Sequence, residues 1–336
     1  MTLAPLSYLL GLVALTLSLR TAPAADTSEV KVVKGKDTID FLIGKDLVAR
    51  YHYGEKVAKP YLWPLNGPGQ IPLTRAWPMQ PAKPGESTDH IHQKSAWFCH
   101  GDVIPEGLNL KHRIKGVEGV DFWSEAPGHG VIACKEVGDA KSDKNHGWLG
   151  TRNEWCTAED VKILDEARTI HLYDLGDARL IVFDIDLHAS VAPITFGDTK
   201  EGAFGLRVSD AIREEKSKGV LENAEGKKSE RNCWGRISKW CDYSGVIDGK
   251  KAGIAILDDA GNPFPACWHG RGYGLMAANP FGRVLSGFPA MQDKKDLVKL
   301  AKGDHLKLRY GILLHSDDAK EGKVEENFVR FVQLRK

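Results

Sequence analysis

The sequence lacks the features that mark several functional classes. Its 46 Lys and Arg nearly cancel its 45 Asp and Glu, so no excess of cations is available to hold a phosphate lattice, and we expect no nucleic-acid partner. The six cysteines include no CxxC pair, which excludes a zinc ribbon and a thioredoxin motif. The glycine-rich stretches are not followed by an amphipathic helix, so neither a Rossmann nor a P-loop unit is predicted and a nucleotide cofactor is unsupported.

Long hydrophobic runs are confined to the amino terminus. Residues 8–19 are apolar but too few to cross a bilayer of about 30 Å, and Ala22 and Ala24 follow at the small-x-small spacing of a cleavage site. We therefore predict a Sec-type signal peptide over 1–24, with an uncleaved anchor as the alternative. The mature protein, 25–336, is expected to be periplasmic or secreted, with no membrane span after cleavage.

Export would make the cysteines eligible for disulfide bonds. Cys233 and Cys241 are the closest pair in sequence and could bridge the ends of a hairpin. Buried free thiols are an equally good interpretation in a chain of 336 residues. The pairing stays open.

Alternation of apolar and polar residues predicts the fold. It recurs at 30–35, 38–44, 46–53, 130–137, 162–175, 178–191, 252–259 and 306–316, with Gly, Asp and Asn between the runs, as in antiparallel strands. Helical periods occur only at 158–168 and 209–218. No repeat or flexible linker divides the chain, so we predict one large all-β domain, either a two-sheet sandwich or a barrel, with few short helices.

One segment that such a core does not require surrounds Asp89-His90-Ile91-His92-Gln93. In an extended chain His90 and His92 would share a face, with Gln93 on the opposite one. Two imidazoles at this spacing can bind a metal or a ligand, or act as a general acid beside a hydrogen-bonding neighbour. A purely structural role is the alternative.

Two further segments combine rings with charged side chains. Asp121, Trp123 and Glu125 suit sugar recognition, in which carboxylates accept hydroxyl protons and rings cover C–H groups; a packed turn is the alternative. His269 and Arg271 would share a strand face, where they could pair a proton carrier with an anion clamp, or simply hold a sheet edge.

The order of these motifs resembles a known family. The stretches YLWPLNGPG, LTRAWP, DHIHQKSAWF, HGDV, GVDFWSE, GDTKEGAFGLRVSD, WCDYSG, GIAILDD and WHGRGYGLMAANPFG are similar to the PmoA-like family, also catalogued as the domain of unknown function DUF6807. The resemblance covers the chain from about residue 30 onward. It implies a galactose-mutarotase-like β supersandwich in an exported bacterial protein associated with carbohydrate use and polysaccharide degradation, and it implies no established activity.

The chain departs from the family in one respect. The family pattern Asp-His-Pro-His-His reads here with Gln93 in place of its last histidine, which argues against a three-histidine metal site. The family label "methane oxygenase" is a misnomer, because the methane monooxygenase subunit spans the membrane several times and this chain has no span after its signal.

Our leading hypothesis is a carbohydrate-active enzyme, an epimerase, lyase or glycoside-cleaving catalyst, that uses no cofactor. The acid/base candidates are His90, His92 and His269, with Asp121 and Glu125 as carboxylate partners. Arginines would bind a substrate carboxylate or an enolate-like charge, and tryptophans would stack on sugar rings; the substrate-binding candidates are Arg75, Trp97, Trp123, Arg207, Trp268, Arg271 and Asn279. The alternatives are a non-catalytic glycan-binding module and an oxygenase with copper or iron at His90 and His92.

Overall fold

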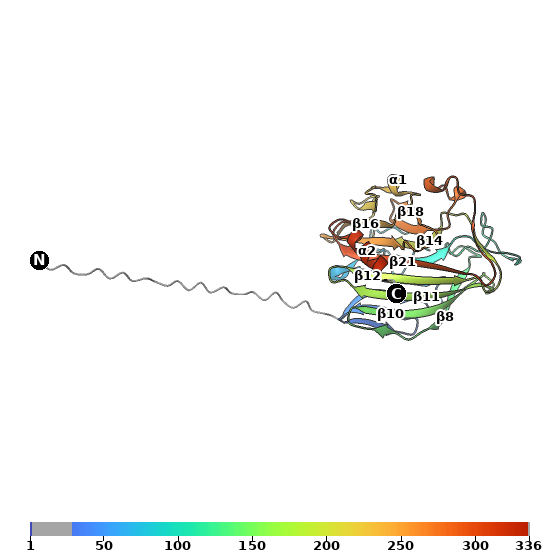
Figure 1. Ribbon diagram of the computed structural model, residues 1–336, viewed down its shortest axis with the longest axis horizontal. Coiled ribbons are helices and arrows are strands. Elements are labelled where there is room, and N and C mark those ends of the chain that lie inside the picture. The colour runs from blue at the N-terminus through green and yellow to red at the C-terminus, as the bar shows by residue number, and fades with distance from the viewer. Residues whose placement is uncertain (2–28, 335–336) are drawn as a thin grey trace.

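The protein is built from two large antiparallel sheets and one small one (Figure 1). The computed structural model describes Met1 and residues 29–334; the rest of the predicted signal peptide lies outside the described residues. The first sheet has the order β1-β2-β3-β4-β6-β14-β19-β18, with β5 paired to β4. Its strands are β1 (Val30–Lys34), β2 (Thr38–Ile43), β3 (Asp46–His52), β4 (Tyr61–Gly67), β5 (Ile71–Pro72), β6 (Ala96–His100), β14 (Gly202–Arg207), β18 (Cys267–Arg271) and β19 (Leu275–Asn279).

The second sheet has the order β15-β16-β17-β21-β12-β11-β10-β8, with β9 paired to β10. Its strands are β8 (Val131–Val137), β9 (Lys141–Ser142), β10 (His146–Cys156), β11 (Lys162–Asp174), β12 (Arg179–His188), β15 (Val220–Asn223), β16 (Trp240–Ile247), β17 (Lys250–Asp258) and β21 (His305–Ser316). The small sheet joins β7 (Val103–Pro105), β13 (Ile194–Phe196) and β20 (Val298–Leu300).

Helices within the described residues are few and short, as predicted. They are α1 (Glu230–Cys233), α2 (Val324–Gln333) and the 3₁₀ turns η1 (Pro68–Gln70), η2 (Val284–Ser286) and η3 (Pro289–Met291). Phe328 and Phe331 of α2 are buried in a cluster with Leu180 and Leu313, so the helix packs on the outer face of the second sheet. No helix within the described ranges is long and apolar enough to cross a membrane.

The predicted strands are confirmed, and the two-sheet sandwich replaces the barrel alternative. The predicted helix at 158–168 is wrong, because β11 begins at Lys162 and its alternate residues Leu164, Glu166 and Arg168 point into the core. The predicted helix at 209–218 is also wrong, since that segment forms turns. The segment at 158–168 places apolar residues three or four apart by coincidence, and pairing within the sheet overrides that spacing.

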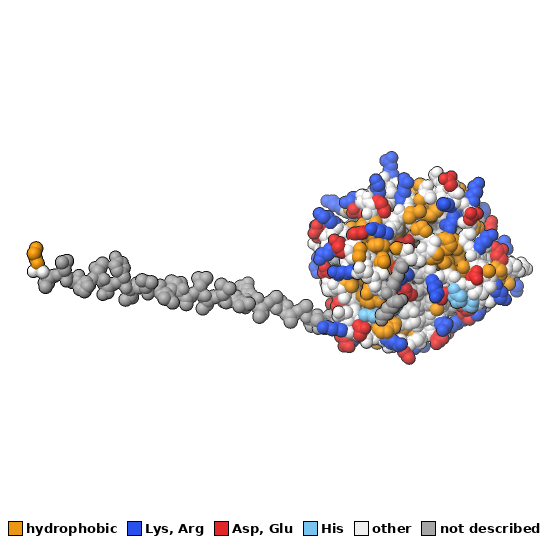
Figure 2. Space-filling model, in the orientation of Figure 1, with side chains coloured by type: hydrophobic (Ala, Val, Ile, Leu, Met, Phe, Trp, Pro, Cys, Tyr) orange, Lys and Arg blue, Asp and Glu red, His pale blue; other side chains and the backbone are white. Residues whose placement is uncertain are grey.

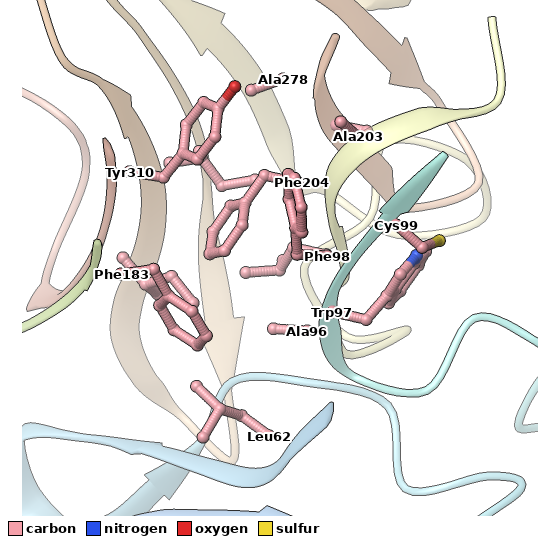
Figure 3. Close-up of a cluster of buried hydrophobic side chains, with 14 of the residues drawn as sticks. Leu62, Ala96, Trp97, Phe98, Cys99, Phe183, Ala203, Phe204, Ala278 and Tyr310 are labelled. Atoms are coloured by element: carbon pink, nitrogen blue, oxygen red, sulfur yellow. The ribbon is translucent and has the colours of Figure 1, made fainter. Parts of the chain in front are cut away.

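The core lies between the facing sides of the two large sheets. Phe98 and Phe204 project from the first sheet toward Phe183 and Tyr310 of the second, and the Phe204 ring lies 5.0 Å from each of those two rings (Figure 3). Trp97, the neighbour of Phe98, points away from this cluster on the other side of β6. This alternation gives the first sheet a second, outward side, which we call its outer face.

Two buried ion pairs interrupt the apolar interior. Arg168 and Glu166 are fully enclosed, with Nε of the arginine 2.5 Å from a carboxylate oxygen of the glutamate. His315 and Asp242 form a second buried pair, 2.8 Å apart. Burial disfavours the charged imidazole, but the aspartate outweighs it and raises the pKa of His315 above its ordinary value.

All six cysteines are free thiols, so the possible Cys233–Cys241 bridge is not formed. Cys241 is buried beside Cys233. Burial, reinforced by its contact with the neighbouring thiol, raises the pKa of Cys241 well above its ordinary value.

Candidate functional site

Strand register brings distant residues into one row on the outer face of the first sheet. Trp97 pairs with Gly205, Gly205 with Ala277, and Ala277 with His269. A Cβ at Gly205 would lie 2.6 Å from the Trp97 ring, so only glycine leaves room for the indole there. Trp123, from the segment before β8, lies over this row with its ring 5.1 Å from that of Trp97.

Two arginines anchor the histidine segment to this face. Arg75 and Arg207 have fully buried side chains, and each donates to the same Asp89 oxygen, at 2.6 and 2.7 Å. Arg75 also donates to the carbonyl of His90, and Arg207 donates to the Gln93 amide oxygen at 2.7 Å. Both guanidinium groups therefore bind this protein's own chain, where the sequence predicted substrate contacts.

His90 is the exposed side chain that this framework presents. Its Nδ1 lies 3.3 Å from the second oxygen of Asp89, the one that the arginines do not use. Its ring is stacked on Tyr273 at 4.9 Å and 9°, and Arg207 covers that phenol at 4.6 Å. The imidazole is thereby held by a carboxylate and a ring, and Nε2 is the nitrogen that does not face the carboxylate.

The segment is a turn and not the extended chain that the residue spacing predicts. His90 has a φ of 48°, and its carbonyl accepts a hydrogen bond from the amide of Gln93 at 2.9 Å. The two histidine rings still meet, edge to face at 5.7 Å. Gln93 is buried on the arginine side, where its amide group also donates to Tyr273.

His92 lies between His90 and two lysines, Lys59 and Lys94. Burial chiefly, together with the positive charge of Lys59, lowers the pKa of His92 to about 3, so its imidazole is neutral at physiological pH. Burial alone would raise the pKa of Glu125, but Lys59 and Lys94 hold it below its ordinary value. Lys94 donates to both Glu125 oxygens at 2.6 Å, so this carboxylate is engaged by lysines.

His269 is almost fully enclosed at the other end of the row. Its Nδ1 lies 2.9 Å from the carbonyl oxygen of Lys200 and therefore carries the proton, which leaves Nε2 as an acceptor. Burial, helped by the charge of Arg271, lowers the pKa of His269 to about 3. Trp123 stacks near this ring at 6.4 Å, and Trp234 meets it edge-on at 5.0 Å.

The remaining sequence candidates have other surroundings. Asp121 caps its own turn, accepting from the amides of residues 123 and 124. Asn279 holds two carbonyls and two amides of neighbouring loops. Trp268 has no exposed surface, because it pairs with Ala278 in the row that faces the core. Arg271 stacks over Trp234 at 4.3 Å and pairs with Glu230 at 2.7 Å.

The structure adds site residues that sequence reasoning missed. Glu201 is one-third exposed, with a carboxylate oxygen 3.9 Å from Nδ1 of His269, and burial raises its pKa above the ordinary value. The others are Lys59, Asp89, Gln93, Lys94, Trp234 and Tyr273. Five of the added residues, Asp89, Gln93, Lys94, Glu201 and Tyr273, lie in motifs already noted, but no spacing rule distinguishes them. We call the assembly the outer-face cluster; it comprises Lys59, Arg75, Asp89, His90, His92, Gln93, Lys94, Trp97, Trp123, Glu125, Glu201, Arg207, Trp234, His269, Arg271 and Tyr273.

The donor set around the histidines does not suit a metal ion. In the part of the chain that the structure describes, no three His, Cys, Asp or Glu side chains are grouped so as to hold one. His92 also lies beside the positive charge of Lys59, which would repel a cation.

A family model matches residues 38–329, most of the chain. The chain belongs to DUF6807, a family of unknown function. The resemblance inferred from the motifs is thus confirmed. No protein of curated function matches the chain in sequence.

Several solved structures resemble the fold at low identity. The GH36 α-galactosidase AgaA from Geobacillus stearothermophilus has 8% identity and a TM-score of 0.40, over 87% of this chain and 41% of that one. A galactose mutarotase related enzyme from Lactobacillus acidophilus has 9% identity and a TM-score of 0.36, over 85% and 97%. The galactosidase domain of the α-galactosidase-sucrose kinase AgaSK has 11% identity and a TM-score of 0.42, over 84% and 41%. The chain therefore spans about two fifths of each galactosidase chain.

Proposed function

We propose that this protein is an exported carbohydrate-active enzyme in which His90 transfers a proton at a sugar carbon or a glycosidic oxygen. The supporting observation is the arrangement around His90, an exposed imidazole whose Nδ1 faces a carboxylate that two buried arginines hold in place. A carboxylate at Nδ1 selects one tautomer and orients the ring, so that Nε2 can take up or release a proton.

The neighbouring groups suit a hydroxyl-rich substrate. His92 is a neutral ring that can accept a hydrogen bond from a hydroxyl, whereas Lys94 can donate one. Sugar hydroxyls both donate and accept, so they match such a mixture. The ring of Trp234, steadied on one face by Arg271, supplies an apolar surface at the rim.

Glu201 is the second proton carrier in this proposal. Burial raises its pKa, so the carboxyl group is more readily protonated than an ordinary glutamate and can act as an acid while His90 acts as a base. An epimerase, a lyase and a glycoside-cleaving enzyme all require such a pair. The arrangement supports the class of proton-transfer reactions on sugars. Experiment must identify the bond that reacts.

The test begins with a thermal-shift screen of the mature protein against neutral and acidic sugars, with and without a chelator. Sugars that raise the melting temperature are then incubated with the enzyme, and products are identified by mass spectrometry. We expect His90→Gln to lower kcat/KM on the order of 10² to 10⁴ fold. His112→Gln is the matched control, because His112 is an exposed histidine that also pairs with a carboxylate, that of Glu159, outside the cluster.

Three outcomes would overturn the proposal. Turnover that survives His90→Gln would remove the proton-transfer role. Saturable sugar binding with no product would make the protein a glycan-binding module. A melting-temperature shift that appears only with copper or iron and disappears with chelator would favour the oxygenase alternative.

A further inference from the structure

The second sheet also has an outward side, which is separate from the outer-face cluster on the first sheet. This outward side carries a groove with a floor of small side chains. Two neighbouring rows of paired residues cross four strands there. The first row is Gly150–Thr169–Asp184–Arg309, and the second is Arg152–Ala167–Asp186–Lys307. Gly150, Thr169 and Ala167 lie where these rows cross β10 and β11, so the surface is hollowed over those strands.

Two adjoining hollows lie over these rows. One, of about 470 Å³, is lined by residues of β11, β12, β21 and the 259–262 turn. The other, of about 250 Å³, is lined by residues of β8, β10 and β11. Ala167 and Thr169 line both hollows, so they form one groove that runs across the strands. We call it the cross-strand groove; the volume of its larger hollow falls within the range of ligand sites in proteins.

Rings border the groove on both sides. The next row on one side pairs Trp148 with His171, and His171 lies 3.1 Å from the groove carboxylate of Asp184. His146 stacks on the Trp148 indole at 4.5 Å. The row on the other side pairs His188 with His305, whose rings stack at 4.3 Å. Aromatic and imidazole side chains therefore stand in the rows on each flank of the floor.

The charged groups in the groove neutralise one another. Arg152 lies 3.5 Å from Glu136, and Asp186 accepts from His305 at 2.8 Å. Arg309 lies 3.6 Å from Asp184 and also near Asp259. On this face, basic and acidic side chains are interspersed with no patch of one sign (Figure 2). Such a surface does not attract a polyanion or a polycation, but it offers many hydrogen-bonding atoms.

We propose that the cross-strand groove binds a neutral polysaccharide chain. An elongated groove with a narrow floor and ring borders accommodates several successive sugar units, and the paired carboxylate, amide and guanidinium groups can exchange hydrogen bonds with their hydroxyls. The site lies on the opposite sheet from His90, so it holds polymer independently of any chemistry there. It would keep the protein on an insoluble or extended glycan, and it does not rest on the proposed function.

Affinity electrophoresis of the mature protein tests this directly. Native gels contain mixed-linkage β-glucan, xyloglucan, galactomannan or pullulan as neutral polymers, and polygalacturonate or heparin as anionic ones. We expect retardation by at least one neutral polymer at both low and high salt. Ala167→Trp fills the floor of the groove from an exposed position and should weaken that binding on the order of tenfold or more.

Two further variants distinguish binding in the groove from binding elsewhere on the surface. Val246→Trp places the same ring at an exposed position of β16, in the same sheet but outside the groove, and should leave retardation unchanged. His90→Ala should also bind polymer as the wild type does, because it alters only the outer-face cluster. Unchanged melting temperatures would show that all three variants are folded.

The proposal fails if no neutral polymer retards the wild type, or if only anionic polymers do so in a salt-dependent manner. It also fails if Ala167→Trp binds as tightly as the wild type. Loss of retardation in His90→Ala with retention in Ala167→Trp would assign polymer binding to the cluster instead. Loss of turnover in His90→Gln has no bearing on the groove, so the two proposals can fail separately.

Discussion

Replacing Asp89 tests whether the two buried arginines depend on this carboxylate. The side chains of Arg75 and Arg207 are 0% exposed, whereas that of Asp89 is 41% exposed. A hydrogen bond to a charged group contributes about 1.5 to 3 kcal/mol. Because water reaches the carboxylate and screens it, we take the low end for each of its two bonds, so Asp89→Ala should cost about 3 kcal/mol of unfolding free energy.

Asp89→Asn tests the contribution of the negative charge separately from that of the hydrogen-bond acceptor. The amide keeps an oxygen for both guanidinium groups but loses the charge, so we expect a cost of about 1 kcal/mol. Both values come from guanidinium unfolding curves followed by tryptophan fluorescence and extrapolated to water. Glu321→Ala is the control, because its ion pair with Lys320 is highly exposed and should contribute less than about 0.5 kcal/mol.

The pH dependence provides a second measure of the same contact. Burial would raise the pKa of Asp89, but Arg207 and Arg75 hold it below its ordinary value. A depressed folded pKa means that the stabilisation is complete above the unfolded value, near pH 4, and is lost as the pH falls through the folded value. This acid-sensitive component should be absent from Asp89→Ala. If Asp89→Ala costs no more than the control, the arginines do not need the carboxylate, and Asp89 does not position His90 as we propose.

Three further predictions concern buried contacts. Glu166→Gln should cost about 3 to 5 kcal/mol of unfolding free energy, because it leaves Arg168 buried without a counter-ion. Replacing both residues with Met should recover most of that loss, as measured by denaturant unfolding. Equal losses in the two variants would contradict this prediction. The pKa of His315 is raised in the folded state, so its contribution to the unfolding free energy is complete below the unfolded pKa, near pH 6.5, and declines as the pH rises through the folded pKa. Asp242→Asn should reverse this slope of unfolding free energy against pH. An unchanged slope would refute the pairing. Gly205→Ala should displace an indole of the outer-face cluster and alter the near-ultraviolet circular dichroism, and an unchanged spectrum would contradict the close approach.

The sequence by itself determined most of the strands. In β11 the side chains at 164–173 alternate between core and surface, and that local period is readable without a fold. It misled at 158–168, where apolar residues also recurred at helical spacing. The motifs likewise singled out His90, His92 and His269 as candidates, because residue type is a local property.

Only the tertiary structure decided which of these residues meet and which are available. Trp97, Gly205, Ala277 and His269 form one row because four strands pair in a register set by long-range contacts, and no local pattern encodes that register. The same pairing turned Trp268 into the core, while the fold buried Arg75 beneath Asp89. Burial and charge pairing are properties of the assembled sheets. The sequence could therefore select Arg75 and Arg207 as candidates, but it could not distinguish a residue that anchors the protein's own chain from one that contacts substrate.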